Sequence, residues 1–263
     1  MMRSALLGLL LAAGTTRPAA AQTPADQRPF AITDNSLLVE EAFNQEAGVF
    51  QSILLLQRPH GREWSLEFTQ EWPLGGQRHQ LSYTVPLEAS KPPGAEDYDV
   101  ARGTIALHYR YQLTDEQGAP FAASPRVSLL LPRGEIADQW GVQLNLPVSK
   151  QLGDVYAHAN AGLTLDAVGS SGRAARWHAA GSLIYRLLPM VHVLVESVYR
   201  ADEHETLAGR EDGWLISPGV RAGVNLGDHQ LVLAAAVPLG LLNDYDTQDF
   251  IAYISYELPF KRR

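Results

Sequence analysis

The sequence predicts an all-β fold: an antiparallel, up-and-down transmembrane β-barrel of about twelve strands, with a short N-terminal latch or plug segment. Three observations predict it. Short runs alternate between apolar and polar residues at period two, the chain begins with an export signal, and no later stretch has the ~20 apolar residues of a spanning helix. Because only helices and closed barrels satisfy their backbone polar groups in lipid, an exported membrane protein of this kind must cross as strands.

Residues 1–21 have the three parts of a secretory signal peptide. Arg3 precedes an apolar core from Ala5 to Ala13, and the small residues 19–21 offer a cleavage site after Ala21. The alternative, a transmembrane anchor, needs a longer apolar core. We therefore expect an exported protein with a cleaved signal peptide, located in the outer membrane of a Gram-negative bacterium.

Charge and cysteine content exclude several classes of partner and cofactor. Removing residues 1–21 takes away Arg3 and Arg17 and changes the formal net charge from -8 to -10, which argues against nucleic acid as a partner. The chain has no cysteine, so it has no disulfide and no thiolate metal site. We expect no cofactor.

Residues 22–46 form the predicted N-terminal segment, and the barrel follows as a single domain over residues 47–263. Leu37, Leu38, Glu41 and Ala42 fit a short helix that starts near positions 34–36. We expect this segment to be a latch or plug, either in the periplasm or folded into the barrel lumen.

The predicted strands are alternating runs separated by Gly, Pro, Asp and Asn, and most are close to the ~9–11 residues that a tilted strand needs to cross a bilayer. The twelve runs cover residues 47–57, 63–72, 78–87, 101–113, 122–131, 140–149, 155–166, 174–187, 190–200, 214–226, 229–238 and 250–260.

Connection lengths predict which end of the barrel faces outward. If the first strand leaves the periplasm, the odd-numbered connections are external and are longer on average than the even-numbered ones. Outer-membrane barrels have this asymmetry, with short periplasmic turns and longer outer loops.

Aromatic residues fall near the predicted strand ends, as in the two interfacial girdles of barrels in lipid. Four tryptophans lie at the start of descending strands, and three further aromatic residues lie at periplasmic ends. The predicted girdle comprises Trp64, Trp140, Trp177 and Trp214 at the outer rim, and Trp72, Tyr185 and Phe260 at the periplasmic rim.

The last strand, "FIAYISYELPF", places apolar or aromatic residues at every second position from Phe250 to Phe260, and we assign that face to lipid. Its pattern resembles the C-terminal insertion signal of bacterial outer-membrane barrels, although "KRR" follows Phe260 here. The resemblance implies two partners, the outer-membrane lipid and the barrel-assembly machinery.

Charged residues on the polar faces of the predicted strands point into the lumen if the barrel is correct. They form either a structural network of paired charges or a selectivity lining that attracts anionic or polar solutes. The candidates are Glu67, His108, Arg110, Arg126, Arg176, His178, Arg186, His192, Glu196, Arg200 and Arg221.

Catalytic and metal-binding patterns are weak. Ser182 and His178 share a strand face near His192, but no GxSxG motif supports a hydrolase, and we predict no catalytic residue. His192 and Glu196 lack a third ligand in sequence reach, so we predict no metal site. Acidic loops are expected to be solvated rather than to bind cations; they contain Asp97, Asp99, Asp244, Asp246 and Asp249.

The stretch "DNSLLVEEAFNQEAGVFQ", which passes directly into a strand, resembles an outer-membrane family catalogued as transporters of a phenol-degradation (meta-pathway) type. The specific match covers about 25 residues. The resemblance implies an outer-membrane barrel that moves small or hydrophobic compounds, and it supplies no catalytic residue.

We therefore predict a passive, porin-like channel for small-molecule solutes, with apolar or aromatic compounds among them. One alternative is a non-conducting structural or interaction barrel whose lumen is closed by the charged network. The other is a soluble periplasmic β-sandwich that binds a ligand, in which the apolar strand faces would form the core.

Overall fold

The computed structural model describes residues 31–32, 34–59, 63–91, 94–131, 140–168, 172–204, 210–242 and 248–260. The predicted signal peptide and its cleavage site lie outside the described residues, as do Asp244 and Asp246 in the last predicted loop. No helix in the described part of the chain is long and apolar enough to cross a membrane.

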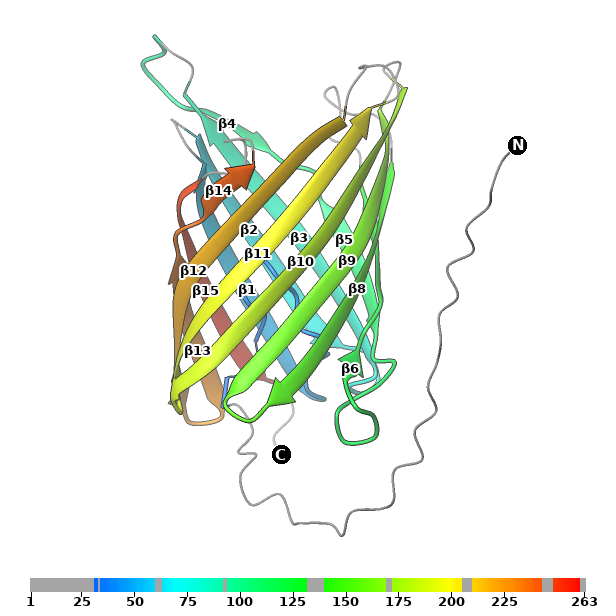
Figure 1. The fold of residues 1–263 in the computed structure, drawn as a ribbon, viewed down its shortest axis with the longest axis vertical. Helices are drawn as coiled ribbons and strands as arrows, with labels where there is room; N and C mark the ends of the chain where they lie inside the picture. The colour runs from blue at the N-terminus through cyan, green and yellow to red at the C-terminus, as the bar shows by residue number, and fades with distance from the viewer. Residues whose placement is uncertain are drawn as a thin grey trace, which may run out of the picture.

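All strands belong to one antiparallel sheet, which closes into a barrel where β11 pairs with β12 (Figure 1). The strands are β1 (Val49–Pro59), β2 (Glu63–Pro73), β3 (His79–Ser90), β4 (Asp99–Arg102), β5 (Ala106–Tyr111), β6 (Ala122–Ala123), β7 (Arg126–Leu130), β8 (Gly141–Leu152), β9 (Val155–Val168), β10 (Gly172–Leu188), β11 (Val191–His204), β12 (Arg210–Leu226), β13 (His229–Ala236), β14 (Leu239–Leu242) and β15 (Gln248–Pro259).

These pieces form twelve spans, as predicted, because three spans are each interrupted once. The runs at 101–113 and 122–131 were expected to be continuous, and that expectation is wrong. The run at 229–238 forms β13, and its span then continues as β14 in residues that were expected to form an external connection. Pro125 separates β6 from β7, and Pro238 separates β13 from β14, because proline has no N–H to donate to the sheet. Between β4 and β5, Gly103 lies so close to the Pro86 ring that a side chain would overlap it.

The two ends of the barrel differ as the sequence predicts. Tight turns join β8 to β9 and β12 to β13 at the end of the barrel where β15 ends (Figure 1). Gly153 and Gly227 supply the positive φ angles, 62° and 68°, that these turns require. We call this end periplasmic and the opposite end outer, following the usual asymmetry of outer-membrane barrels.

The two faces of the sheet have opposite polarity. Large apolar side chains on the outside are exposed, for example Leu144 (52 %) and Leu183 (54 %). Many inward positions are polar and buried, for example Ser128 and Asn145. A soluble sandwich would have the reverse arrangement, because its apolar side chains form the core. The sandwich alternative is therefore wrong, and the outer surface suits lipid.

In the last strand the faces are as predicted. Ile254 on the even-numbered face is 44 % exposed, whereas Ile251, Tyr253 and Ser255 on the odd-numbered face are buried inside the barrel.

The N-terminal segment forms no helix where it is described, contrary to expectation, and instead runs as an irregular chain inside the barrel. Its N–H groups bond to barrel side chains rather than to carbonyls one turn back, which removes the reason for a helix. We call residues 31–46 the lumen segment. Ile32 and Leu37 of this segment belong to an apolar cluster with inward residues of the wall: Ile53, Tyr156, Ile184, Leu194, Val232, Ala236, Ile251 and Tyr253.

Candidate functional site

The lumen segment is attached to the barrel wall mainly through its backbone. One carboxylate oxygen of Glu196 on β11 accepts hydrogen bonds from the N–H groups of Leu38 (2.8 Å) and Val39 (3.0 Å). Glu196 is fully buried, so one carboxyl oxygen inside the barrel holds two successive residues of the segment.

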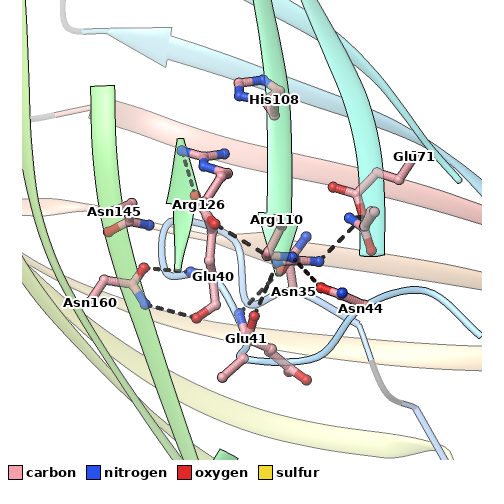
Figure 2. Close-up of polar contacts among 12 residues, drawn as sticks. Asn35, Glu40, Glu41, Asn44, Glu71, His108, Arg110, Arg126, Asn145 and Asn160 are labelled. Atoms are coloured by element: carbon pink, nitrogen blue, oxygen red, sulfur yellow. Dashed lines mark hydrogen bonds and ion pairs between the residues drawn. The ribbon is translucent and has the colours of Figure 1, made fainter. Parts of the chain in front are cut away.

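Two further wall residues bind the middle of the segment. The Asn160 amide makes a two-way contact with Glu40: its Oδ1 accepts from the backbone N–H (2.8 Å), and its Nδ2 donates to the carbonyl (2.9 Å) (Figure 2). The Ser149 hydroxyl accepts from the N–H of Ala42 (2.8 Å).

Wall amides bind the end of the segment in the same way. Gln112 accepts from the N–H of Asn44 (2.9 Å), and Gln80 accepts from the N–H of Gln45 (2.6 Å). Buried backbone groups must find partners, and here inward side chains supply them in place of secondary structure. The wall is therefore shaped to receive an extended peptide.

Arg221 is the cation at the start of the lumen segment and is 1 % exposed. Its Nη1 donates to the carbonyl of Asp34 (2.7 Å) and to the carboxylate of Glu41 (3.1 Å), while its Nε donates to His192 Nδ1 (3.1 Å). A buried charge needs such compensation, so Arg221 and the segment stabilise each other.

Two acids of the segment are themselves buried. Asp34 accepts hydrogen bonds from the Tyr253 hydroxyl (2.6 Å) and the Gln51 amide (2.7 Å), and burial raises the pKa of its carboxyl. Burial also raises the pKa of Glu41 to about 8, although the neighbouring Arg221 acts in the opposite direction.

Arg110 and Arg126 lie opposite each other on β5 and β7, and Glu40 lies between them (Figure 2). Arg126 Nη2 is 2.8 Å from one Glu40 carboxylate oxygen, and Arg110 Nη1 is 3.8 Å from the other. Arg110 also donates to Asn44 Oδ1 (3.0 Å) and lies 3.8 Å from Glu71.

The lumen segment separates two cavities of about 690 Å³ each. Leu38 and Glu40 line the outer cavity, and Asp34 and Glu41 line the inner cavity at the periplasmic end. The consecutive residues Glu40 and Glu41 thus face different cavities, on opposite sides of the segment. The segment forms a partition across the lumen.

The register places all eleven candidate lumen residues at inward positions. The wall brings four of them to the segment or its acids, and a fifth, His192, accepts a hydrogen bond from Arg221. The four are Arg110, Arg126, Glu196 and Arg221.

The other six candidates lie apart from the segment's backbone. His178 lies 3.1 Å from Asn145, and His108 lies between Ser128 (2.7 Å) and Thr84 (3.1 Å). Arg176 pairs with Asp166 and Arg186 with Asp154, at 2.5 and 2.6 Å. Glu67 is at an inward position of β2, and Arg200 lines the outer cavity.

All seven predicted girdle residues occupy outward positions. Trp140 (56 %) and Phe260 (51 %) are the most exposed of them, at opposite ends of the barrel. Trp177 and Trp214, also about half exposed, lie several residues inside β10 and β12, deeper in the wall than the rim position predicted for them. Trp64 and Trp72 pack edge-on against Phe250 and Tyr83, and Tyr185 is 48 % exposed.

The serine and histidine residues considered as catalytic or metal-binding candidates have structural partners in the barrel. Ser182 bonds to Ser36 of the segment (2.8 Å), and no hydrogen bond among the described residues joins it to His178. Ser149 and His158 are hydrogen-bonded (2.7 Å), and both are buried, with the Ser149 hydroxyl also bound to the N–H of Ala42 in the segment. Among the described residues, no cluster of three metal-ligating side chains exists.

Sequence reasoning missed the wall residues that bind the segment, notably Gln80, Ser149, Asn160 and Tyr253. Period-two polarity places Asn160 on the inward face of its strand, and it could have placed Gln80 and Ser149 there too. It could not have shown that they bind peptide backbone, because that depends on the segment entering the lumen.

No family model matches the chain, and no curated protein matches its sequence. Solved structures do match. An outer-membrane channel from Pseudomonas putida F1 is similar with a TM-score of 0.57 and 14 % identity, over 82 % of this chain and 97 % of the channel. The fold is that of an outer-membrane β-barrel. The NanC porin is similar with a TM-score of 0.50 and 9 % identity, over 81 % of this chain and all of the porin.

Proposed function

We propose that the protein is an outer-membrane channel for the passive passage of small molecules, and that the lumen segment closes it. One observation carries the proposal: the segment lies across the lumen between two cavities, attached by hydrogen bonds rather than by a continuous sheet. Such contacts allow the segment to leave without breaking the barrel. The wall has its own closed ladder of strand pairs.

Deletion of residues 30–45 tests this proposal. We expect a folded barrel with a higher single-channel conductance in planar bilayers than the full-length protein, because the partition between the cavities is gone. Heat-modifiable migration on a gel provides the folding control. An intact barrel with unchanged conductance would refute the role of the segment as a plug.

The non-conducting alternative also has an observation in its favour. The contacts of Arg221, Glu41 and Glu196 cross the lumen and are nearly inaccessible to solvent. A barrel of this kind would stay closed when residues 30–45 are removed, so the same experiment separates the two functions. We prefer the channel because cavities open on both sides of a thin partition.

Further parts of the proposal rest on the outward surface and on the resemblance found in the sequence. The apolar outer face fits outer-membrane lipid, and the last strand is proposed to engage the barrel-assembly machinery. Membership of the phenol-degradation transporter family stays a prediction from the sequence of the lumen segment. The site geometry supports transport rather than catalysis.

A further inference from the structure

A row of basic side chains winds along the inside of the barrel wall. Residues in direct register across adjacent strands share one face, so a chain of such pairs can be followed from strand to strand. The row passes through Gln80, Arg110, Arg126, Asn145, Gly162, His178, Arg200 and Gly213, on β3, β5, β7, β8, β9, β10, β11 and β12. It contains three arginines and a histidine, and no acid.

The neighbouring rows differ. The next row toward the periplasm, across β8 to β12, carries no charge: Pro147, Asn160, Ala180, Val198 and Leu215. The next row toward the outer end mixes Arg176 with Asp202 and Glu211. The single-sign row is thus a distinct feature of the described wall.

Glycine keeps the row continuous. A Cβ at Gly162 would overlap the His178 ring, so only glycine lets the imidazole lie across β9 toward Asn145. The row begins in the outer cavity, which Arg200, His178 and Arg126 line, and it ends at Arg110 beside the inner cavity.

The Arg110–Arg126 pair requires an anion. Like charges directly opposite each other on neighbouring strands are destabilising, and a carboxylate between two guanidinium groups relieves that repulsion. Glu40 from the lumen segment supplies the carboxylate. Its fit is incomplete: Glu40 Oε2 and Arg126 Nε are both buried without a hydrogen-bond partner.

Other arginines that line the outer cavity have acids of the wall as partners, such as Asp166 for Arg176 and Asp212 for Arg210. Arg126 pairs instead with Glu40 of the segment, which is the part able to move. When the segment leaves, Arg126 loses its anion.

We propose that this row is a binding site for the carboxylate group of small anionic solutes that enter from outside, with Glu40 as its internal occupant in the closed state. The proposal rests on the proposed channel and names its substrate class. A solute carboxylate would compete with Glu40 at Arg126 and so favour release of the segment. Solute entry and opening are then coupled, since each favours the other.

Calorimetry on the detergent-solubilised, full-length protein tests the site without requiring conduction. The probe is benzoate, and benzyl alcohol serves as an uncharged control of similar shape. We expect Glu40→Gln to bind benzoate with roughly tenfold higher affinity than the natural sequence, corresponding to about 1.4 kcal/mol of removed competition. Glu46→Gln, which removes an exposed acid of the same segment, should leave the affinity unchanged.

The double change Glu40→Gln with Arg126→Gln should abolish the gain. Three results would each overturn the proposal. The natural sequence and Glu40→Gln could bind benzoate with equal affinity, the double variant could bind it as tightly as Glu40→Gln, or benzyl alcohol could bind as tightly as benzoate. Heat-modifiable migration confirms that each variant is folded.

A conductance measurement separates this proposal from the channel itself. Benzoate in the outer compartment should raise the open fraction of the full-length protein, and benzyl alcohol should not. If removal of residues 30–45 opens the channel but benzoate binds nowhere, the anion site is wrong and the channel stands. If benzoate binds as predicted but no variant conducts, the channel function is wrong.

Discussion

At the scale of single residues, the closed state depends on buried charges that face each other across the lumen. Glu41 is surrounded by Arg221 at 3.1 Å, His158 at 3.5 Å, and the charges of Asp34 and Arg110. The segment therefore carries its own acids into a place where water does not stabilise them, and its insertion must depend on pH.

Alkaline pH should favour release of the segment. The pKa of Glu41 is about 8 in the inserted state and near 4.5 in water, so the inserted form holds a proton that the released form gives up. Insertion is then most stable below about pH 4.5 and weakens as pH rises toward 8, after which it levels off. Asp34, whose pKa is also raised, changes in the same direction.

Open fraction measured in planar bilayers between pH 5 and 9 checks this dependence. Glu41→Gln should make the profile less steep, leaving the contribution of Asp34. A profile equally steep in Glu41→Gln would show that another group controls the pH response.

Glu196 should be a strong anchor of the segment, because one of its carboxyl oxygens holds two backbone donors. Glu196→Ala removes both bonds, each worth roughly 0.5–1.5 kcal/mol. We expect faster hydrogen exchange at the amides of Leu38 and Val39 in the full-length protein. Glu196→Gln keeps an acceptor oxygen and should exchange more slowly than the alanine variant; equal exchange in all three proteins would contradict this role.

At the scale of elements, alternation along the strands fixes the faces, and this could be predicted from the sequence. Strand β9 shows it clearly, with His158, Asn160 and Thr164 buried inside and Leu165 exposed outside. The interruptions at Pro125 and Pro238 could not be predicted as reliably, because a proline at the edge of a run fits a strand end as well as a break. The lumen segment was mistaken for a helix because its backbone binds side chains far away in the sequence, for example 35 residues away for Gln45 with Gln80 and 187 residues away for Asp34 with Arg221.

Because one face of β10 is assigned to lipid and the other to the lumen, we expect a charged substitution to destabilise the barrel more on the outward face than on the inward face. Leu183 points outward, whereas Ala180 lines the outer cavity. Leu183→Arg should destabilise the barrel in lipid vesicles by about 2–4 kcal/mol if it lies near the bilayer midplane, and Ala180→Arg should have a much smaller effect. Unfolding in urea measures both. A larger loss of unfolding free energy for Ala180→Arg than for Leu183→Arg would contradict the assignment of the faces.

At the scale of the whole molecule, the barrel is a closed wall with a movable partition. Strand number, the ends of the barrel and the inward charges followed from the sequence, because they depend on local periodicity and turn residues. The partition did not, since it depends on contacts such as Ser36 with Ser182 that join distant parts of the chain. The sequence allowed a periplasmic latch as readily as a lumen plug.

The most direct test of the account is to lock the segment in place. The chain has no cysteine, and the hydroxyls of Ser36 and Ser182 are 2.8 Å apart, so Ser36→Cys with Ser182→Cys gives a single designed disulfide. Single-channel recording should show a closed barrel when the pair is oxidised and openings after reduction, with each single-cysteine variant unaffected by reductant. Equal conductance of the oxidised and reduced protein would contradict the claim that the lumen segment closes the channel.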